Sequence, residues 1–425
     1  MLILGGTLFD GTETTRIEEC GIRIDDGRFT AVGSKSDFSP AGGEQVIDAT
    51  GLYLMPGLVD MHLHVSFSYG TGGLKYGVGS YGQLLMDIIV KSPPETTIAA
   101  GRTTAVMLAK GVTTARDLAG SHDVPVQIRD AINRGEILGP RLVVCGKPIV
   151  ITGGHAWNTC IEADGTDGFR KAARELLKSG VDYIKVMASH DPWPMPGAEK
   201  TRAELSLAEM TAAFAEAHEW GRAACCHAMG SVAIARSLEA GVDMLEHGQY
   251  LTDRLAERMA SSNVVLTPTL SCYDVQSLKP RPEFGGGEWA DAHKVLIPGH
   301  HAGFAAALAA GVTMTVGTDA AGIYAEEVDL MRRLGMKAHA SLMACTSNGA
   351  RALQMEDQIG KVRPGLRADL VLLRSDPMLD AYALEQVELV IKDGRPHRPA
   401  DIAYSDSLTP PPTMLQRASG SSASI

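Results

Sequence analysis

The central part of the chain alternates between short apolar segments and helical segments, and this alternation constrains the fold more than any other feature. From residue 57 to about residue 353, apolar runs are separated by stretches with helical periodicity. The eight candidate strands are Leu58–His64, Val112–Leu118, Arg141–Ile149, Tyr183–Ser189, Ala223–His227, Met244–Gly248, Val264–Leu270 and Thr313–Asp319. Strands that alternate with helices are typical of parallel sheets. Eight such units predict an α/β fold, a (β/α)8 TIM barrel formed by residues 57–355.

The two ends of the chain have a different pattern, with short β-type runs separated by turns. Residues 1–56 contain Gly-rich and Asp-rich turns such as Asp25-Asp26-Gly27, and residues 356–408 return to the same pattern. We therefore predict that these two segments pair into one small, discontinuous β-sandwich domain. Residues 409–425 contain three consecutive prolines followed by a Ser-rich stretch, which predicts a disordered tail.

The composition excludes several classes of partner. The chain has 39 Lys and Arg against 50 Asp and Glu, a net charge of −11, and it has no long basic run. Nucleic acids and anionic membranes both favour clustered cations, so neither is expected as a partner. No apolar stretch approaches the roughly 18 residues of a membrane span, and the first residues lack the charged start of a signal peptide. We expect a cytoplasmic protein that acts on a small molecule.

A pair of histidines, His62 and His64, ends the first candidate strand. Residues i and i+2 of a strand point to the same side, so two imidazoles at this spacing can bind one cation. The pair alone is equally consistent with hydrogen-bonded core histidines. However, active sites of (β/α)8 barrels lie at the carboxyl ends of the strands, which favours the metal-binding interpretation.

Other titratable residues occupy equivalent positions. His227 ends the fifth strand, His247 ends the sixth, and Asp319 ends the eighth. Lys185 lies inside the fourth strand between two apolar residues. Each histidine by itself is more often a hydrogen-bonded core residue than a ligand, but a buried ammonium is costly unless it is paired, neutralised or chemically modified. Taken together, these residues predict a metal-dependent active site.

This set of residues, with the motifs around it, resembles the amidohydrolase superfamily. The flanking motifs are Pro56-Gly57-Leu58-Val59-Asp60-Met61 before the barrel and Gly365-Leu366-Arg367-Ala368-Asp369-Leu370-Val371 after it. Three further segments resemble the prolidase-like branch: Thr152–His155, Ile184–Ser189 and Leu245–Gly248. Members of that branch are metal-dependent dipeptidases that act on Xaa-Pro or Xaa-Arg, carboxypeptidases, and amide hydrolases of the ochratoxin-amidase type.

The resemblance implies a centre of two divalent metal ions. It places His62, His64 and Asp319 around the more buried ion and His227 and His247 around the second. Lys185, carboxylated by CO2, would bridge the two. Zinc suits this set of ligands, although Mn²⁺, Co²⁺ and Fe²⁺ are alternatives. Two ions about 3.5–4 Å apart can share a hydroxide that attacks the substrate carbonyl. Asp319 would then transfer the hydroxide proton to the leaving amine.

The resemblance also suggests residues that contact the substrate. His155 follows the third strand in a Gly-Gly-His turn and is implied to stabilise the oxyanion, although a loop histidine bonded to backbone is the alternative. The chain departs from the branch where relatives carry a Tyr or His after the fifth strand and a Gly pair after the fourth, which puts inherited specificity in doubt. Met229 and His190 stand at these two places, and Tyr250 could stabilise the oxyanion instead. Trp157 and Trp193 could form an aromatic wall for an aryl substrate, with ordinary packing as the equal alternative.

The implied activity is hydrolysis of an amide or peptide bond in an N-acyl amino acid, a dipeptide or an aryl amide. Alternatives are a carbamate, urea, ester or lactone hydrolase, because the same hydroxide attacks any activated carbonyl. A mononuclear deaminase or imidazolone-ring hydrolase of the same superfamily is disfavoured, because such relatives typically lack the fourth-strand lysine. A catalytically silent scaffold is disfavoured because every ligand position is filled. Relatives often form even-numbered assemblies, so a homo-oligomer is also implied.

Overall fold

The computed structural model describes residues 1–12, 16–67, 92–190, 202–274, 288–319 and 323–402, with side chains left out for residues 288–295. Trp193 and the predicted 409–425 tail lie outside the described residues. Within the described part, no helix has the length and apolar character needed to cross a membrane.

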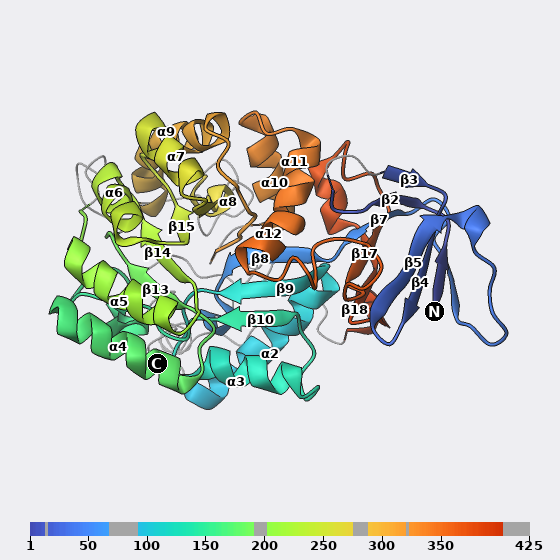
Figure 1. The fold of residues 1–425 in the computed structure, drawn as a ribbon, viewed down its shortest axis with the longest axis horizontal. Helices are drawn as coiled ribbons and strands as arrows, with labels where there is room; N and C mark the ends of the chain where they lie inside the picture. Colours follow the sequence, from blue (N-terminus) through green and yellow to red (C-terminus); the bar gives the residue numbers. More distant parts are fainter. Residues whose placement is uncertain (13–15, 68–91, 191–201, 275–287, 320–322, 403–425) are drawn as a thin grey trace, which may run out of the picture.

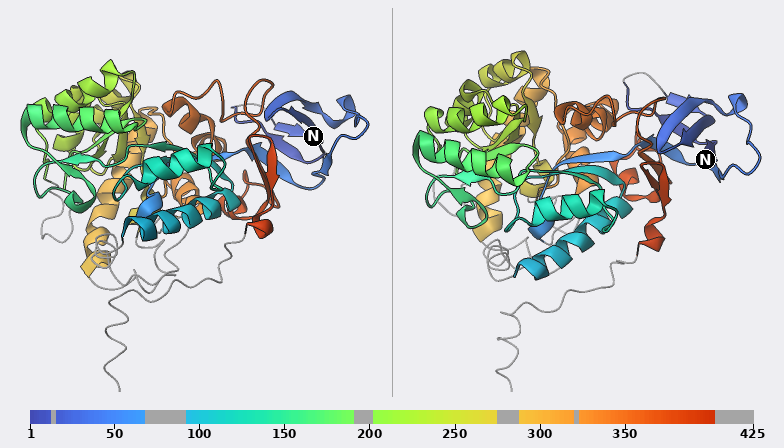
Figure 2. Two further views of the ribbon diagram at one scale, coloured as in Figure 1. Left: turned by 90° about the horizontal axis from the view of Figure 1, so that it is seen from below. Right: turned by 60° about the horizontal axis from the view of Figure 1, so that its bottom comes forward.

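Strands from both ends of the chain share one sheet at one side of the molecule (Figures 1 and 2). This sheet has the order β19-β18-β17-β7-β2-β3, and β17 pairs antiparallel with β7. Its strands are β2 (Thr7–Phe9), β3 (Arg16–Glu18), β7 (Tyr53–Pro56), β17 (Leu370–Leu373), β18 (Val387–Lys392) and β19 (Arg395–His397). A second sheet, β5-β4-β1-β6, contains β1 (Leu2–Leu4), β4 (Cys20–Asp25), β5 (Arg28–Ser34) and β6 (Val46–Asp48).

Strand β17 is buried on both faces, because its alternate side chains enter two different apolar clusters. Leu370 and Leu372 pack in the cluster shared by the two end sheets. Val371 and Leu373 pack in the large cluster that surrounds the central sheets. Since alternate residues of a strand face opposite sides, this one strand joins the two cores.

The central part of the chain forms two parallel sheets, which confirms the predicted α/β class. The first has the order β10-β9-β8 and the second the order β12-β11-β13-β14-β15-β16. Their strands are β8 (Leu58–Leu63), β9 (Val112–Asp117), β10 (Arg141–Val144), β11 (Ile149–Val150), β12 (Ile161–Glu162), β13 (Ile184–Met187), β14 (Ala224–Ala228), β15 (Met244–His247) and β16 (Val265–Thr267).

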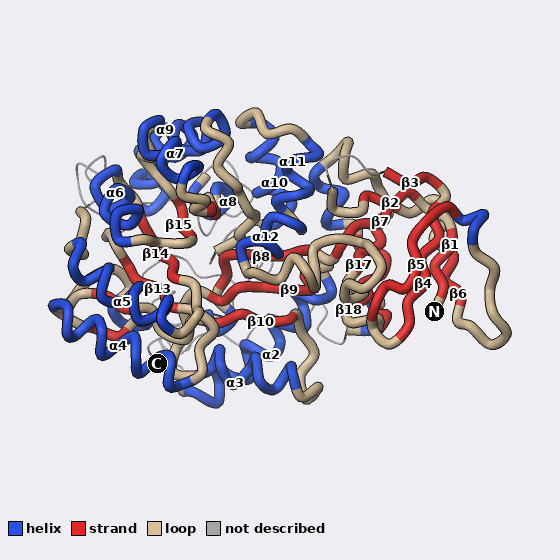
Figure 3. Tube along the Cα trace, in the orientation of Figure 1, coloured by secondary structure: helices blue, strands red, loops and turns tan. Residues whose placement is uncertain are grey.

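Helices surround these sheets, as the colouring by secondary structure in Figure 3 shows. They are α2 (Pro93–Ala109), α3 (Val124–Asn133), α4 (Gly165–Ser179), α5 (Leu207–Glu219), α6 (Ser231–Ala240), α7 (Asp253–Ser261), α8 (Leu270–Tyr273), α9 (Glu288–Ala309), α10 (Tyr324–Arg333), α11 (Ala338–Ala344) and α12 (Ser347–Ala352). Helix α5 begins at a capping box in which Ser206 and Glu209 satisfy each other's backbone N–H groups.

Two of the eight predicted strands differ from the prediction. The third, Arg141–Ile149, is divided into β10 and β11, which lie in different sheets. Gly146 has a φ of 67° and is followed two residues later by Pro148, which lacks an N–H, so the ladder is interrupted between them. The eighth, 313–319, is not a regular strand. It still hydrogen-bonds to both parallel sheets, since Leu266 donates to the Thr313 carbonyl and Met61 donates to the Val316 carbonyl.

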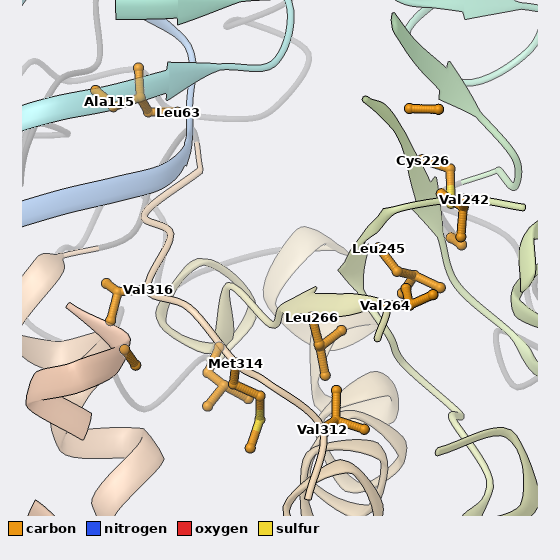
Figure 4. Close-up of a cluster of buried hydrophobic side chains, with 14 of the residues drawn as sticks. Leu63, Ala115, Cys226, Val242, Leu245, Val264, Leu266, Val312, Met314 and Val316 are labelled. Carbon is orange, nitrogen blue, oxygen red and sulfur yellow. The ribbon is translucent and has the colours of Figure 1, made fainter. Parts of the chain in front are cut away.

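In the larger sheet, each of four strands has a polar residue two positions after a residue that belongs to an inner apolar cluster. Tyr183, Cys225, Met244 and Val265 belong to that cluster, and Lys185, His227, Glu246 and Thr267 follow them at i+2. Residues at i and i+2 share a face, so the second set faces the same interior nearer the carboxyl ends. The intervening residues Cys226, Leu245 and Leu266 belong to the apolar cluster of Figure 4, which packs against the helices.

Candidate metal centre

The structure brings the six predicted metal ligands together at the carboxyl ends of the parallel strands. They come from five different places: the end of β8, the interior of β13, β14, the end of β15 and the segment that follows residue 313. The residues are His62, His64, Lys185, His227, His247 and Asp319, and all six side chains are buried or nearly so.

Asp319 lies among three of the histidines. Its Oδ1 is 3.1 Å from His64 Nε2 and 3.6 Å from His62 Nε2. The ligand atoms of His62, His64 and Asp319 all lie within 4.8 Å of one another, a spacing that one metal ion could fill. Burial favours the protonated acid, but His62 and His64 hold the pKa of Asp319 well below its ordinary value. Asp319 is therefore an anionic group suited to a cation.

A second group of ligands lies beside the first. The rings of His227 and His247 have centroids 4.6 Å apart, and those of His62 and His247 are 5.0 Å apart. His227 Nε2 is buried and has no hydrogen-bond partner in the described part of the chain. Lys185 is 2% exposed, and no hydrogen bond or ion pair holds its ammonium among the described residues. An unpartnered imidazole nitrogen fits an atom that serves as a metal ligand, and an unpartnered buried ammonium calls for neutralisation or modification.

Hydrogen bonds at Nδ1 set the tautomer of three of the histidines. The contacts are His62 Nδ1 to Glu246 Oε2 at 2.9 Å, His64 Nδ1 to the Ala119 carbonyl at 3.2 Å and His247 Nδ1 to Thr269 Oγ1 at 2.7 Å. An acceptor at Nδ1 keeps the proton there and leaves the Nε2 lone pair for a metal ion. Burial also lowers the pKa of His62 to about 4, so this imidazole is neutral at pH 7, as ligation requires.

Left-handed backbone conformations at the strand ends direct consecutive side chains into the site. His247 has a φ of 72° and Asp319 a φ of 53°. In a regular strand, Glu246 and His247 would face opposite sides of the sheet. The positive φ at His247 breaks this alternation, and both side chains reach His62 or its neighbours. Non-glycine residues in this conformation are uncommon and cluster at functional sites.

His155 lies against the second group of ligands. Its ring stacks on His227, with centroids 4.2 Å apart and planes inclined by 13°. Burial, with smaller contributions from His190 and Lys185, lowers the pKa of His155 to about 3. The ring is therefore neutral at pH 7 and has one N–H to donate.

Glu204, which the sequence did not single out, connects His155 to His190. Its Oε2 accepts from the His155 backbone N–H at 3.0 Å, and its Oε1 lies 2.9 Å from His190 Nδ1. The Glu204 side chain is 2% exposed, whereas that of His190 is 41% exposed. The buried carboxylate thus holds one histidine against the ligands and a second histidine at the accessible side of the site.

The remaining candidate substrate residues lie in different surroundings. Trp157 begins a short 3-10 helix and is 54% exposed. Met229 is fully buried just after β14. The ring of Tyr250 packs directly over Gly299 of α9, where any side chain would clash. Tyr273, which is not among those candidates, has its ring centroid 5.3 Å from that of the predicted ligand His247.

Three buried charged residues around the ligands were also missed. Asp60 accepts from the Thr318 hydroxyl at 2.8 Å and so ties β8 to the segment that carries Asp319. Arg116 and Glu246 are fully buried next to each other. Asp60 lies between two apolar residues of its strand, which is the signal that identified Lys185 and could have found it. Glu246 has an apolar residue on one side only, and Arg116 lies beside Asp117 in a Thr-containing strand, so the signal is weaker for these two.

Comparisons with known proteins found a matching family and several relatives. A family model described as "Amidohydrolase family" matches residues 53–397. The ochratoxinase of Aspergillus niger is 27% identical over 373 residues, which cover 79% of this chain and 73% of that protein. Two solved structures are also similar. One is a Xaa-Pro dipeptidase with bound methionine, at 27% identity and a TM-score of 0.81, covering 93% of this chain and 99% of that one. The other is a prolidase complexed with N-methylphosphonate-L-proline, at 26% identity and a TM-score of 0.82, covering 93% and 98%.

Proposed function

Because the chain belongs to the amidohydrolase family, we propose that it is a metal-dependent hydrolase that cleaves an amide or peptide bond in a small substrate. The observation that carries the proposal is the cluster around Asp319, whose Oδ1 lies 3.1 Å and 3.6 Å from the Nε2 atoms of His64 and His62. Names of the relatives, ochratoxinase and Xaa-Pro dipeptidase, support cleavage of a carbon–nitrogen bond. We also propose that the two parallel sheets and residues 313–319 form one closed (β/α)8 barrel.

The residues present fit a centre of two divalent ions. His62, His64 and Asp319 would hold one ion, and His227 and His247 would hold the second. Carboxylated Lys185 would lie between them. The unpartnered His227 Nε2 and the buried Lys185 ammonium support this assignment. An ammonium cannot bind a cation, whereas a carbamate supplies a negative charge and two oxygens. When bound, zinc or a similar ion would polarise the substrate carbonyl and activate a water molecule.

Three protein side chains would carry out proton transfer, oxyanion stabilisation and substrate contact. Asp319 is ionised and buried, so it can accept the proton of the attacking water and pass it to the leaving nitrogen. The neutral His155 ring can donate its N–H to the oxygen on which negative charge develops. His190, held by Glu204, is positioned to contact the substrate on the accessible side.

The test combines a metal count with a substrate panel. The purified full-length protein is stripped of metal and reconstituted with Zn²⁺ and bicarbonate, and bound zinc is measured per chain. Release of free amine is then followed for N-acyl amino acids, dipeptides and aryl amides, with carbamates and esters alongside. We expect two zinc ions per chain and turnover of at least one amide class. Asp319→Asn is the control, because it keeps an oxygen ligand but cannot accept the proton.

Two outcomes would contradict the proposal. If the protein hydrolyses only esters or only carbamates, the proposed cleavage of an amide or peptide bond is wrong. One tightly bound zinc per chain, with unchanged activity when Lys185 is replaced, would favour a mononuclear centre.

A further inference from the structure

Below the proposed metal centre, a buried arginine and a buried glutamate lie in contact with one of the ligands. Arg116, in β9, and Glu246, in β15, are both fully buried. Arg116 Nη2 bonds to Glu246 Oε1, and Glu246 Oε2 lies 2.9 Å from His62 Nδ1. Three strands of the two parallel sheets are thus connected in one line of hydrogen bonds: β9, β15 and β8.

The arginine is itself held rigidly. Its Nε donates to the Met61 carbonyl at 2.7 Å, and its guanidinium lies 5.6 Å from the centre of the Tyr183 ring. A guanidinium has donors only and an ionised carboxylate has acceptors only. Since one Glu246 oxygen faces Arg116 and the other faces His62, the His62 proton must lie on Nδ1. The lone pair then lies on Nε2, and this nitrogen is 3.6 Å from Asp319 Oδ1.

We propose that Glu246 and Arg116 are positioning residues for His62: Glu246 fixes the His62 tautomer, and Arg116 fixes which atoms Glu246 presents to it. This inference rests on the proposed function, because it concerns the readiness of His62 Nε2 to bind a metal ion. Partners of this kind beyond the ligands themselves typically change metal affinity about 10–100-fold.

The Glu246→Gln substitution should change the tautomer of His62. A glutamine amide has one oxygen acceptor and one NH2 donor. Arg116 has only donors, so it takes the oxygen and turns the NH2 group toward His62. Nδ1 of His62 must then accept, and its proton moves to Nε2, the atom needed for the metal ion. The substitution therefore reverses the tautomer with almost no change in side-chain shape.

Removing the arginine should repair this defect. In the double variant Arg116→Met/Glu246→Gln, the guanidinium no longer competes for the amide oxygen, which can face His62 Nδ1 again. The proton returns to Nδ1 and Nε2 regains its lone pair. Replacement of a buried ion pair by uncharged groups of similar volume is often tolerated, so this variant is expected to fold.

The experiment measures Zn²⁺ affinity by competition with a chelator, using the full chain and each variant. We expect Glu246→Gln to weaken binding about 10–100-fold and the double variant to recover most of that loss. Asp369→Asn is the matched control, since Asp369 is also a buried carboxylate paired with an arginine, Arg141, at 2.8 Å. It lies in the loop before β17 and contacts none of the ligands, so its Zn²⁺ affinity should not change.

Several results would overturn the proposal. Wild-type affinity in Glu246→Gln would do so, and so would a double variant as weak as the single one, because a merely structural defect would not be repaired by removing Arg116. If Glu246→Gln does not fold, the double variant decides alone: a tenfold or greater loss of affinity overturns the proposal. Absence of zinc binding by the wild-type protein would instead refute the proposed function itself.

Discussion

Replacement of Lys185 by methionine should stabilise the metal-free protein. Lys185 lies inside β13 and is 2% exposed, and methionine fills a similar volume without the charge. One candidate for a counter-charge, Asp117, is weakened because burial raises its pKa to about 8. Replacing buried charges by apolar groups often stabilises a protein by about 1–4 kcal/mol. For a chain of 425 residues that corresponds to a rise in Tm of roughly 1–5 °C.

The order should reverse when the metal ions are present. With Zn²⁺ and bicarbonate, the proposed carbamate would make the wild-type lysine an anionic ligand, a role that methionine cannot take. A ligand at 1,000 times its Kd stabilises a protein by about 4.1 kcal/mol, so at that excess of Zn²⁺ the loss of one ion should outweigh the gain from removing the charge. Calorimetry with and without Zn²⁺ and bicarbonate, with zinc counted per chain, measures both effects.

Lys185→Arg provides the control, because it keeps the positive charge but cannot form the carbamate. It should lose the second ion without stabilising the metal-free protein. A metal-free Lys185→Met variant that is less stable than the wild type would refute the reasoning about burial. Two ions bound by Lys185→Met with wild-type affinity would refute the bridging role.

Three further predictions concern other residues. His155→Ala should lower kcat for the amide substrate about 100–1,000-fold with little change in KM, and an unchanged kcat in steady-state assays would exclude the oxyanion role. Glu204→Ala removes the acceptor shared by the His155 backbone and the His190 ring, so KM should rise while Zn²⁺ affinity is retained; kinetics and chelator competition separate the two. Burial lowers the pKa of His300 to about 4, so its neutral form contributes stability above the unfolded value near 6.5 that is lost as the pH falls toward 4. The free energy of unfolding of His300→Gln should therefore fall less steeply with decreasing pH than that of the wild type, by up to about 1.4 kcal/mol per pH unit. Equal slopes for the two proteins in urea unfolding between pH 7 and 4.5 would contradict this.

The family and the α/β class could be predicted from the sequence, and both are confirmed. The class follows from local patterns, because apolar runs and helical periodicity are properties of short segments. The division of Arg141–Ile149 into two strands was missed, because the apolar run was interpreted as one strand although it contains Gly146 and Pro148. Pairing across the 313–319 segment depends on residues far away in the chain, and no local pattern reports it.

In the candidate site, too, the residues marked by local patterns were predicted and those that depend on distant contacts were not. His62, His64 and Asp319 were identified because each lies at the end of a predicted strand, and the end of an apolar run is visible in the sequence. Glu204 was missed because it acts from a connecting segment, and its two histidine partners come from two other segments. That His247 faces the same interior as Glu246 depends on a single left-handed residue, and alternation along a strand would have placed it on the other face.

The pairing of β17 with β7 has a consequence for how the chain is made. β7 is synthesised near the start, and β17, its partner, only after some 300 further residues. Until then β7 has an unpaired edge, and unpaired edges invite association between chains. Because the side chains of β17 complete two cores at once, a chain that stops before Leu370 would leave both of them open. Premature termination late in the message should therefore yield aggregates rather than a smaller working enzyme.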